Sequence, residues 1–244
     1  MNLKNKTVLI TGGVKRVGRT IAETLAKRGA NLILHYNRSK KDALNAQKAL
    51  SRLGVQVDLF QADLTKIPAL EKKVKQLLKT QKIDVLINNA SSFYSTPFGK
   101  IKEKEWDDLV NSNLKGPFFL NQLIAKQMLK RKKGKIIFIG DWSSLRPYTN
   151  YTPYSVAKAG VLTLTQILAK TLAPHIQVNC VSPGSVLLPK NFSAKDKKKI
   201  IQKTPLKRIG SPEDIAQGTL FFLEGTDFAT GSNLIIDGGQ LISS

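Results

Sequence analysis

The chain has 244 residues, 41% of them hydrophobic, which is enough for one domain and ordinary for a globular protein. These values exclude a disordered chain, a collagen and a coiled-coil rod. Lysine and arginine total 39 against 17 acidic residues, a net charge of +22, but most of the basic residues are lysines spread along the whole sequence. A nucleic-acid surface usually concentrates its basic residues, so we expect no specific nucleic-acid partner and a field that attracts anionic cofactors.

The single cysteine, Cys180, excludes an intrachain disulfide framework and a multi-cysteine metal site. No apolar window reaches the roughly 18 residues that a membrane span needs. The first apolar run, 8–10, is also too short for the core of a secretory signal. We therefore expect no metal, no membrane association and a cytoplasmic protein.

Short apolar runs alternate with longer amphipathic stretches along the chain. The runs have the length of strands, and they cover 7–10, 32–35, 55–60, 83–87, 135–139, 176–181 and 233–236. The stretches with helical spacing cover 19–27, 39–53, 70–79, 105–130 and 154–172. This alternation predicts a single α/β domain over 1–244, with a doubly wound parallel sheet of about seven strands and helices on both faces. Ligands bind such sheets at the carboxyl ends of the strands, so functional residues should follow the strand runs.

A glycine-containing turn follows the first strand run and precedes a helix. Gly12 and Gly13 permit a tight turn, Gly18 permits close packing of helix on strand, and free N–H groups at the helix start can hold a diphosphate. The spacing differs from the general G-x-G-x-x-G pattern, and a glycine turn without a ligand is the alternative. The cofactor contacts predicted here are Gly12, Lys15, Arg16 and Val17.

The end of the second strand run selects the cofactor. An acidic residue there would hold the ribose 2′-hydroxyl of NADH, but no carboxylate occurs before Asp42. Arg38 can meet a 2′-phosphate with its guanidinium fork and Ser39 can donate a hydrogen bond, which favours NADPH. The alternative is a basic first turn of a surface helix. The cofactor residues predicted along this edge are His35 (which belongs first to the strand end), Tyr36, Asn37, Arg38 and Ser39, then Asp63 and Leu64. Asp63 would face the adenine amino group or, alternatively, act as a helix N-cap.

Polar residues that suit proton transfer follow the later strands. Asn89, Ala90 and Ser91 come after the fourth run, where they would lie beside the cofactor ribose. Asn113 lies inside the next long helical stretch, a position that disfavours Asn. Tyr154 and Lys158 are four residues apart and share a helix face, so the ammonium can lower the pKa of the phenol and prepare it to move a proton. A surface pair is the alternative for this common spacing.

These features together resemble the short-chain dehydrogenase/reductase family over essentially the full chain. The matching residues are Thr11-Gly12 with Gly18, Asn88-Asn89-Ala90, Asn113, Tyr154-x-x-x-Lys158, Pro183-Gly184 and Asp237-Gly238-Gly239. The resemblance implies a Rossmann-type sheet, hydride transfer from a nicotinamide and a homotetramer. Pro183, Gly184 and Ser185 follow the sixth strand run and should border the nicotinamide. The polar segment 185–203 is expected to be a mobile substrate lid.

Three departures from the common family pattern point to one branch. Arg16 and Ser91 stand where the family has Gly, and Asp141 stands where it has Ser, thirteen positions before Tyr154. Ser143 and Ser144 follow closely, so a local shift could still supply a serine. The chain is similar to the pteridine reductases in Lys15-Arg16, in His35-Tyr36-Asn37-Arg38-Ser39, in Asn89-Ala90-Ser91-Ser92-Phe93, and in Asp141 with Tyr154 and Lys158. The short segment after Gly184 makes a bacterial pterin or folate reductase a closer match than the parasite enzymes.

The chemistry of these residues suits a pterin. A flat ring can stack between Phe93 and the nicotinamide, while Arg16 and Ser91 serve its polar atoms. Tyr154 would give a proton to the ring nitrogen, Lys158 would tune it and bind the ribose, and Asp141 would position it. A carboxylate beside a phenol disfavours the phenolate, so we expect Asp141 to work best when protonated or hydrogen-bonded. The predicted catalytic residues are Asn113, Asp141, Tyr154 and Lys158; the predicted substrate contacts are Arg16, Ser91, Phe93, Asp141 and Tyr154.

Two other functions remain open at this point. A reductase of 3-oxoacyl-acyl-carrier-protein, or of another carbonyl, would have the same fold but would normally carry Ser at position 141. A non-catalytic nucleic-acid binder is disfavoured by the intact Tyr154, Lys158, Asn113 and glycine turn. Of the remaining residues, Cys180 should be buried, His175 solvated, and Trp106 and Phe118 should pack between helices.

Overall fold

The computed structural model describes residues 1–188 and 192–243 and places seven parallel strands in one sheet. The strands are β1 (Thr7–Ile10), β2 (Asn31–Tyr36), β3 (Val57–Gln61), β4 (Val85–Asn88), β5 (Gly134–Ile139), β6 (Ile176–Pro183) and β7 (Asn233–Ile236). Their order is β3-β2-β1-β4-β5-β6-β7, with every neighbouring pair parallel. The order reverses between β1 and β4, the position where doubly wound sheets open a ligand crevice. The predicted α/β Rossmann-type fold is confirmed.

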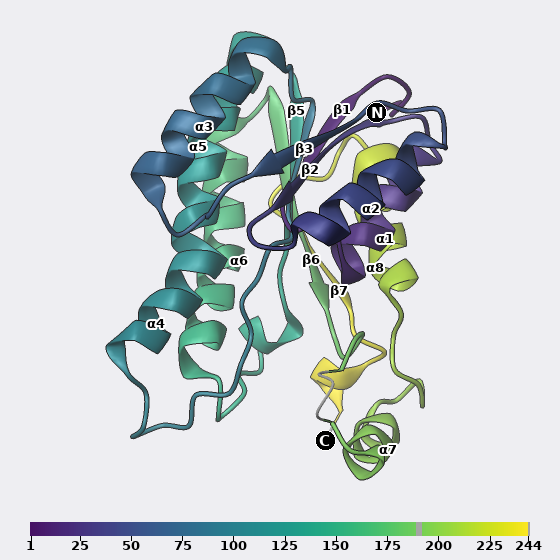
Figure 1. Ribbon diagram of the computed structural model, residues 1–244. Helices are drawn as coiled ribbons and strands as arrows, with labels where there is room; N and C mark the ends of the chain where they lie inside the picture. Colours follow the sequence, from purple (N-terminus) through teal and green to yellow (C-terminus); the bar gives the residue numbers. More distant parts are fainter. Residues whose placement is uncertain (189–191, 244) are drawn as a thin grey trace.

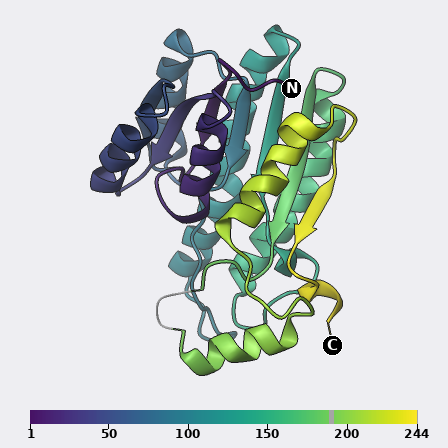
Figure 2. The same cartoon turned by 90° about the vertical axis from the view of Figure 1, so that its right-hand side faces the viewer.

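Helices cover both faces of the sheet (Figures 1 and 2). On one face lie α1 (Arg16–Ala26), α2 (Lys40–Ser51) and α8 (Pro212–Leu220); on the other lie α3 (Ile67–Thr80), α4 (Glu103–Val110), α5 (Gly116–Lys130) and α6 (Thr152–Leu172). Successive strand residues point to opposite faces, so Val8 and Ile10 join the core under α1 and α8 while Leu9 joins the core under α3, α5 and α6. No helix in the described ranges combines the length and apolarity needed to cross a bilayer.

The long helix predicted over 105–130 is interrupted. A π-helical turn, Asn111–Lys115, joins α4 to α5, and the N–H of Gly116 bonds to the carbonyl of Asn111. Asn113 lies inside this turn and donates from its amide nitrogen to the Leu109 carbonyl at 2.8 Å, which competes with the regular helical bond. A Cβ at Gly116 would meet the Leu64 carbonyl at 2.4 Å, so glycine lets the start of α5 approach the end of β3.

Two helices follow β6 that the periodicity did not predict. α7 (Ala194–Lys203) buries no residue and lies at the carboxyl edge of the sheet, near the C-terminus (Figure 2). It falls in the segment 185–203 that we expected to be a lid; that role stays a prediction, and positions 189–191 lie outside the described residues. α8 begins with a reciprocal capping box between Ser211 and Asp214, a signal that the sequence carried.

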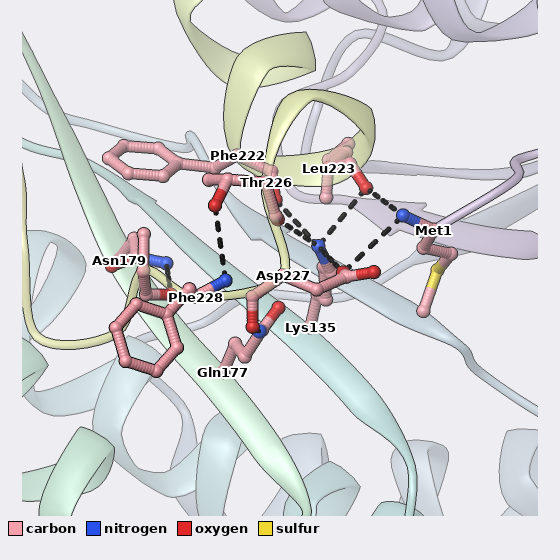
Figure 3. A network of polar contacts seen from close by, with 10 residues as sticks. Met1, Lys135, Gln177, Asn179, Phe222, Leu223, Thr226, Asp227 and Phe228 are labelled. Atoms are coloured by element: carbon pink, nitrogen blue, oxygen red, sulfur yellow. Dashed lines mark hydrogen bonds and ion pairs between the residues drawn. The ribbon is translucent and has the colours of Figure 1, made fainter.

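A buried lysine anchors the opposite, amino edge of the sheet (Figure 3). Lys135, near the start of β5, donates from Nζ to the carbonyls of Phe222, Leu223 and Thr226 at 2.8, 3.1 and 3.0 Å, and forms an ion pair with Asp227 at 2.7 Å. These carbonyls belong to the helical turn Phe221–Gly225 that ends α8 and to the residue after it. A cation at the end of a helix satisfies carbonyls that have no partner within the helix.

Candidate active site

His35, near the end of β2, stabilises the glycine turn after β1 through a hydrogen bond. The N–H of Gly12 donates to His35 Nδ1 at 3.2 Å, and the ring contacts the Ala62 carbonyl through Nε2 at 3.0 Å, so the proton lies on Nε2. Burial lowers the pKa of His35 to about 4, which keeps the ring neutral. Both ring nitrogens are therefore used by the backbone, so His35 shapes the loop that would hold the cofactor, and its own contact with the cofactor stays a prediction.

Asn89 joins the ends of β1 and β4. Its amide nitrogen donates to the Thr11 and Gly12 carbonyls at 2.9 and 3.2 Å, while the Thr11 hydroxyl accepts from the N–H groups of Asn89 and Ala90. A Cβ at Gly18 would lie 2.3 Å from the Gly12 carbonyl oxygen and 2.4 Å from the Asn89 amide. Gly12 itself has φ +63°, so both glycines are required by the turn.

The basic residues of the glycine turn make defined contacts. Lys15 forms an ion pair with Asp42 at 2.7 Å, which neutralises the first carboxylate after β2. Arg16 has φ 51°, unusual for a residue other than glycine, and its guanidinium donates to the Leu187 carbonyl at 2.9 Å. Val17 follows at the start of α1 and is half-buried. Arg16 thus links the turn to the segment after β6.

The predicted 2′-phosphate residues lie at the turn from β2 into α2. Tyr36 is buried, Asn37 and Arg38 are exposed, and Ser39 is the residue before the first turn of α2. The guanidinium of Arg38 forms no hydrogen bond or ion pair with the described part of the chain, so it is free to bind an anion.

Asp63 lies two residues after the end of β3 and closes a turn. It accepts from the N–H and hydroxyl of Thr65, and although burial acts to raise the pKa of Asp63, these bonds outweigh it and lower that pKa. The residue before α3 is Lys66, so Asp63 is not the helix N-cap considered as its alternative. Leu64, beside it, is buried.

Tyr154, Asp141 and Lys158 lie together at the carboxyl end of β5. The Tyr154 hydroxyl donates to Asp141 Oδ2 at 2.6 Å, and Asp141 Oδ1 accepts from the Ser143 N–H at 2.7 Å. Lys158 Nζ donates to the Ile139 carbonyl at 2.8 Å and lies 5.7 Å from the centre of the Tyr154 ring. Ser143 and Ser144 have buried hydroxyls without partners in the described residues. The local shift that would have brought a serine to Tyr154 does not occur.

The ionisation of this group differs from the sequence expectation. Burial, followed by the charge of Asp141, raises the pKa of Tyr154 well above its ordinary value. Burial also lowers the pKa of Lys158, with the charge of Asp141 opposing it. The expectation of a lowered pKa for the phenol is corrected, because burial and the charge of Asp141 raise it. Tyr154 is held as a neutral phenol that can act as an acid.

Ser91 and Asn113 meet beside this group. The Ser91 hydroxyl donates to Asn113 Oδ1 at 2.6 Å, and Asn113 Nδ2 donates to the Ser92 carbonyl at 2.9 Å. A hydrogen bond from Ser91 also acts to lower the pKa of Tyr154, against the larger effects of burial and Asp141. The π-helical turn therefore fixes the loop after β4 next to the phenol.

Tyr154 lies beside the predicted substrate contact Phe93 and near three aromatic residues to which the sequence assigned no role, Trp142, Tyr148 and Tyr151. Phe93 lies parallel to Tyr151 with ring centres 4.6 Å apart and edge-to-face with Tyr154 at 4.7 Å. Trp142 Nε1 donates to the Tyr148 hydroxyl at 2.6 Å, and Tyr148 contacts Tyr151 at 5.6 Å. The signal that could have found them is the density of aromatic residues between Asp141 and Tyr154.

The comparison with known proteins decides the family. The family model for short chain dehydrogenase matches residues 6–199. The chain belongs to the short-chain dehydrogenase/reductase family. Its fold, oxidoreductase class and use of a nicotinamide dinucleotide are thereby shown.

Three similar proteins are named as reductases of different substrates. The 3-oxoacyl-[acyl-carrier-protein] reductase FabG of Chlamydia trachomatis is 32% identical, over 98% of both chains. Among solved structures, FolM Alternative dihydrofolate reductase 1 from Brucella canis, complexed with NADP, has a TM-score of 0.92 at 29% identity and covers 100% of this chain and 96% of its own. An actinorhodin polyketide ketoreductase with NADPH has a TM-score of 0.89 at 27% identity, over 97% of both chains.

The geometry of this family member fits a dinucleotide at the crevice. The glycine turn is preformed, Arg38 is exposed and free, and Lys158 spends one donor on a carbonyl. Beyond β6, the N–H of Ser185 donates to Gln240 Oε1 at 2.9 Å, and a Cβ at Gly184 would lie 2.6 Å from Asp237. Pro183, Gly184 and Ser185 therefore form a rigid rim at the carboxyl edge of β6.

Proposed function

We propose that this chain is an NADPH-dependent reductase that transfers hydride to the C=N bond of a pterin-type ring, converting a dihydropteridine or dihydrofolate to its tetrahydro form. The observation that carries the proposal is the 2.6 Å hydrogen bond between Tyr154 and Asp141, in the place where the wider family has a serine. A buried phenol with a raised pKa keeps its proton at neutral pH until a strongly basic acceptor forms, and a ring nitrogen that gains electrons from a hydride on the neighbouring carbon is such an acceptor.

NADPH is proposed over NADH on the charges at the end of β2. Arg38 is exposed and unpaired within the described residues, and Ser39 lies beside it. The nearest carboxylate along the chain, Asp42, is paired with Lys15 at 2.7 Å and so does not repel a phosphate as a free acid would. A guanidinium recognises a phosphate with parallel hydrogen bonds.

The nicotinamide, when bound, supplies the hydride for the ring carbon. Tyr154 gives its hydroxyl proton to the adjacent ring nitrogen, so that the substrate gains one hydride and one proton. Lys158, buried nearby, stabilises the resulting phenolate, while Asp141 destabilises it and favours rapid return of a proton. Ser91 and Arg16 would bind polar atoms of the ring, and Asn113 holds Ser91 in place.

A second candidate is the reduction of 3-oxoacyl-acyl-carrier-protein. The FabG relatives, at 32% identity over nearly the whole chain, support this reading more directly than they support a pterin. The hydroxyls at positions 143 and 144 do not reach Tyr154, however, so the usual serine of that reaction has no counterpart among the described residues here. Residue 141 is what separates the two candidates.

We also propose that the protein forms a homotetramer. Trp106 on α4 and Phe118 on α5 are 40% and 39% exposed, which corrects the expectation that they pack between helices of one chain. Leu129 and Ile167 add exposed apolar surface on α5 and α6. Apolar side chains of this size on neighbouring helices favour burial against a second copy. Light scattering measures the assembly, and a monomer at micromolar concentration would contradict it.

The reaction is tested by following NADPH oxidation with dihydrobiopterin, dihydrofolate and acetoacetyl-CoA in parallel. We expect turnover with a dihydropterin or dihydrofolate and its loss in Tyr154→Phe, with NADH a poor substitute for NADPH. Turnover with the acyl substrate alone would overturn the pterin proposal and establish the second candidate.

A further inference from the structure

The rings around Tyr154 form a closed circuit of contacts. Trp142 is covalently next to Asp141 and is bonded to Tyr148, Tyr148 contacts Tyr151, Tyr151 stacks on Phe93, and Phe93 contacts Tyr154. The circuit closes because Tyr154 is hydrogen-bonded to Asp141. The proposed mechanism uses Asp141 and Tyr154, and Phe93 is a predicted substrate contact, but the other three aromatic residues have no assigned role.

Trp142 and Tyr148 are joined by a hydrogen bond between their side chains, at the part of the circuit most distant from Phe93 along this series of contacts. It measures 2.6 Å, and the two rings meet edge-to-face at 85° with centres 5.6 Å apart. An indole N–H and a phenol that meet at both the ring and the polar atom have one relative orientation. Asp141 fixes the start of this turn by accepting from the Ser143 N–H, so Trp142 is itself placed by the catalytic carboxylate.

Tyr151 connects the Trp142–Tyr148 pair to Phe93, the predicted substrate contact, because it packs against both Tyr148 and Phe93. Its ring is parallel to Phe93 within 1°, and the backbone beside it is tied to the same loop by the bond from the Thr96 N–H to the Asn150 carbonyl at 2.7 Å. Tyr151 covers one face of Phe93, while Phe93 stays 42% exposed. The orientation of Tyr151 therefore fixes how much of Phe93, and at what angle, is left for an incoming flat ring.

We propose that Trp142 and Tyr148 are positioning residues which, through Tyr151 and Phe93, set the preference of this enzyme for a flat ring over a flexible acyl chain. This inference rests on the proposed function. Both residues act through Phe93 in this proposal: their hydrogen bond holds the stack at the angle that accepts a ring. Tyr148 accepts this bond as a neutral phenol, because burial, followed by the charge of Asp141, raises the pKa of Tyr148.

The test is a double-mutant cycle with Trp142→Phe and Tyr148→Phe, which remove the two polar atoms and leave an aromatic ring at each position, although a smaller one at position 142. Each single variant should raise KM for the dihydropterin or dihydrofolate about fivefold, the value of one neutral hydrogen bond, and should lower kcat much less. The double variant should also show about fivefold, since both changes remove the same bond, where independent effects would multiply to about 25-fold. KM for acetoacetyl-CoA should change less than KM for the ring substrate.

Tyr94→Phe is the matched control. Tyr94 lies on the same loop as Phe93, but its hydroxyl donates to Asp108 on α4, outside the circuit. We expect this variant to keep the ring KM of the wild type. Unchanged ring KM in both single variants of the cycle, or effects that multiply, would overturn the inference.

Failure of the inference can be told from failure of the proposed function by direct binding. The chain has two tryptophans, so in a Trp106→Phe background Trp142 is the only emitter. Titration of dihydrofolate into this protein with NADP⁺ should change the Trp142 emission, and adding Tyr148→Phe should weaken binding about fivefold. Binding with no turnover would refute the proposed reaction and keep the positioning role. Equal binding with and without the Tyr148 hydroxyl, or no binding at all, would refute the positioning role.

Discussion

Two buried lysines lie at opposite ends of strand β5, Lys135 at its amino end and Lys158 near its carboxyl end. They show that the same side chain can stabilise the fold or take part in chemistry. Lys135 near the start of β5 is surrounded by three carbonyls and a carboxylate. Lys158 on α6, next to the end of the same strand, donates to one carbonyl, that of Ile139. An ammonium has three donors, so Lys135 is saturated by the protein, whereas Lys158 has donors left for a ribose or a phenolate. The number of unused donors separates an anchor from a functional group.

The largest expected effect comes from Lys158→Met. Removing the charge beside Tyr154 should lower kcat about a thousandfold, within the range of a lost acid–base contribution. The free energy of unfolding should stay the same or rise, because burial disfavours the charged form of Lys158 and the variant removes that cost. Steady-state kinetics and urea unfolding measure the two quantities on the same preparation. A variant that is active but unstable would contradict the distinction drawn between the two lysines.

Replacing Lys135 by methionine should have the opposite result: a lower free energy of unfolding with little change in kcat. Lys135→Met removes the donor to the carbonyls of Phe222 and Thr226, while the Leu223 carbonyl keeps its bond from the Met1 ammonium at 2.8 Å; we expect a cost of about 4 kcal/mol for the two lost bonds to a charged group. The exposed Asp227, with 73% of its side chain accessible, is rehydrated and adds little. Urea unfolding should show the loss, while kcat at low temperature stays close to that of the wild type. A fall in kcat without a fall in stability would place Lys135 in the active site.

His35 extends the comparison. It lies near the carboxyl ends of the strands, beside the candidate site, yet both of its ring nitrogens are hydrogen-bonded to the backbone. Its folded pKa of about 4 lies below the ordinary value near 6.5, so the unfolded chain takes up a proton first as the pH falls. The stability that depends on neutral His35 is complete above pH 6.5 and is lost between there and about pH 4, amounting to about 3 kcal/mol. His35→Gln should flatten this part of the curve of unfolding free energy against pH. A variant with the slope of the wild type would show that another group causes the loss.

The sequence alone was sufficient where a residue and its partner are close along the chain. The strands Thr7–Ile10 and Asn233–Ile236 were predicted to the residue, and Tyr154 with Lys158 share a helix turn that fixes their relation. Lys135 shows the opposite case: its partners lie 87 or more residues away, and a lysine at the start of an apolar strand carries no sign of them.

His35 likewise shows no sequence sign that it accepts from Gly12, a contact between the ends of two strands. The helices α7 and α8 were missed for a different reason. The helix α7 is polar and buries no residue, so it shows little apolar periodicity. The helix α8 has only nine residues and begins with Pro212, although the sequence before it carried the Ser211 capping signal. Asp141 was correctly singled out as a departure, but only the folded chain shows which of its neighbours reaches Tyr154.

The smallest expected effect is a displacement of the pH profile by Asp141→Asn. The negative charge of Asp141 is the second largest cause, after burial, of the raised pKa of Tyr154. Asparagine keeps the size and an acceptor oxygen but removes the charge, so the pKa of Tyr154 falls. Since the phenol must be protonated to act as an acid, the basic limb of log kcat against pH should move to lower pH, while Asp141→Glu should leave it near that of the wild type. An identical profile in the Asn variant would mean that Asp141 is already neutral in the working enzyme, and the carboxyl would then act as a hydrogen-bond donor to the phenolate rather than as a charge.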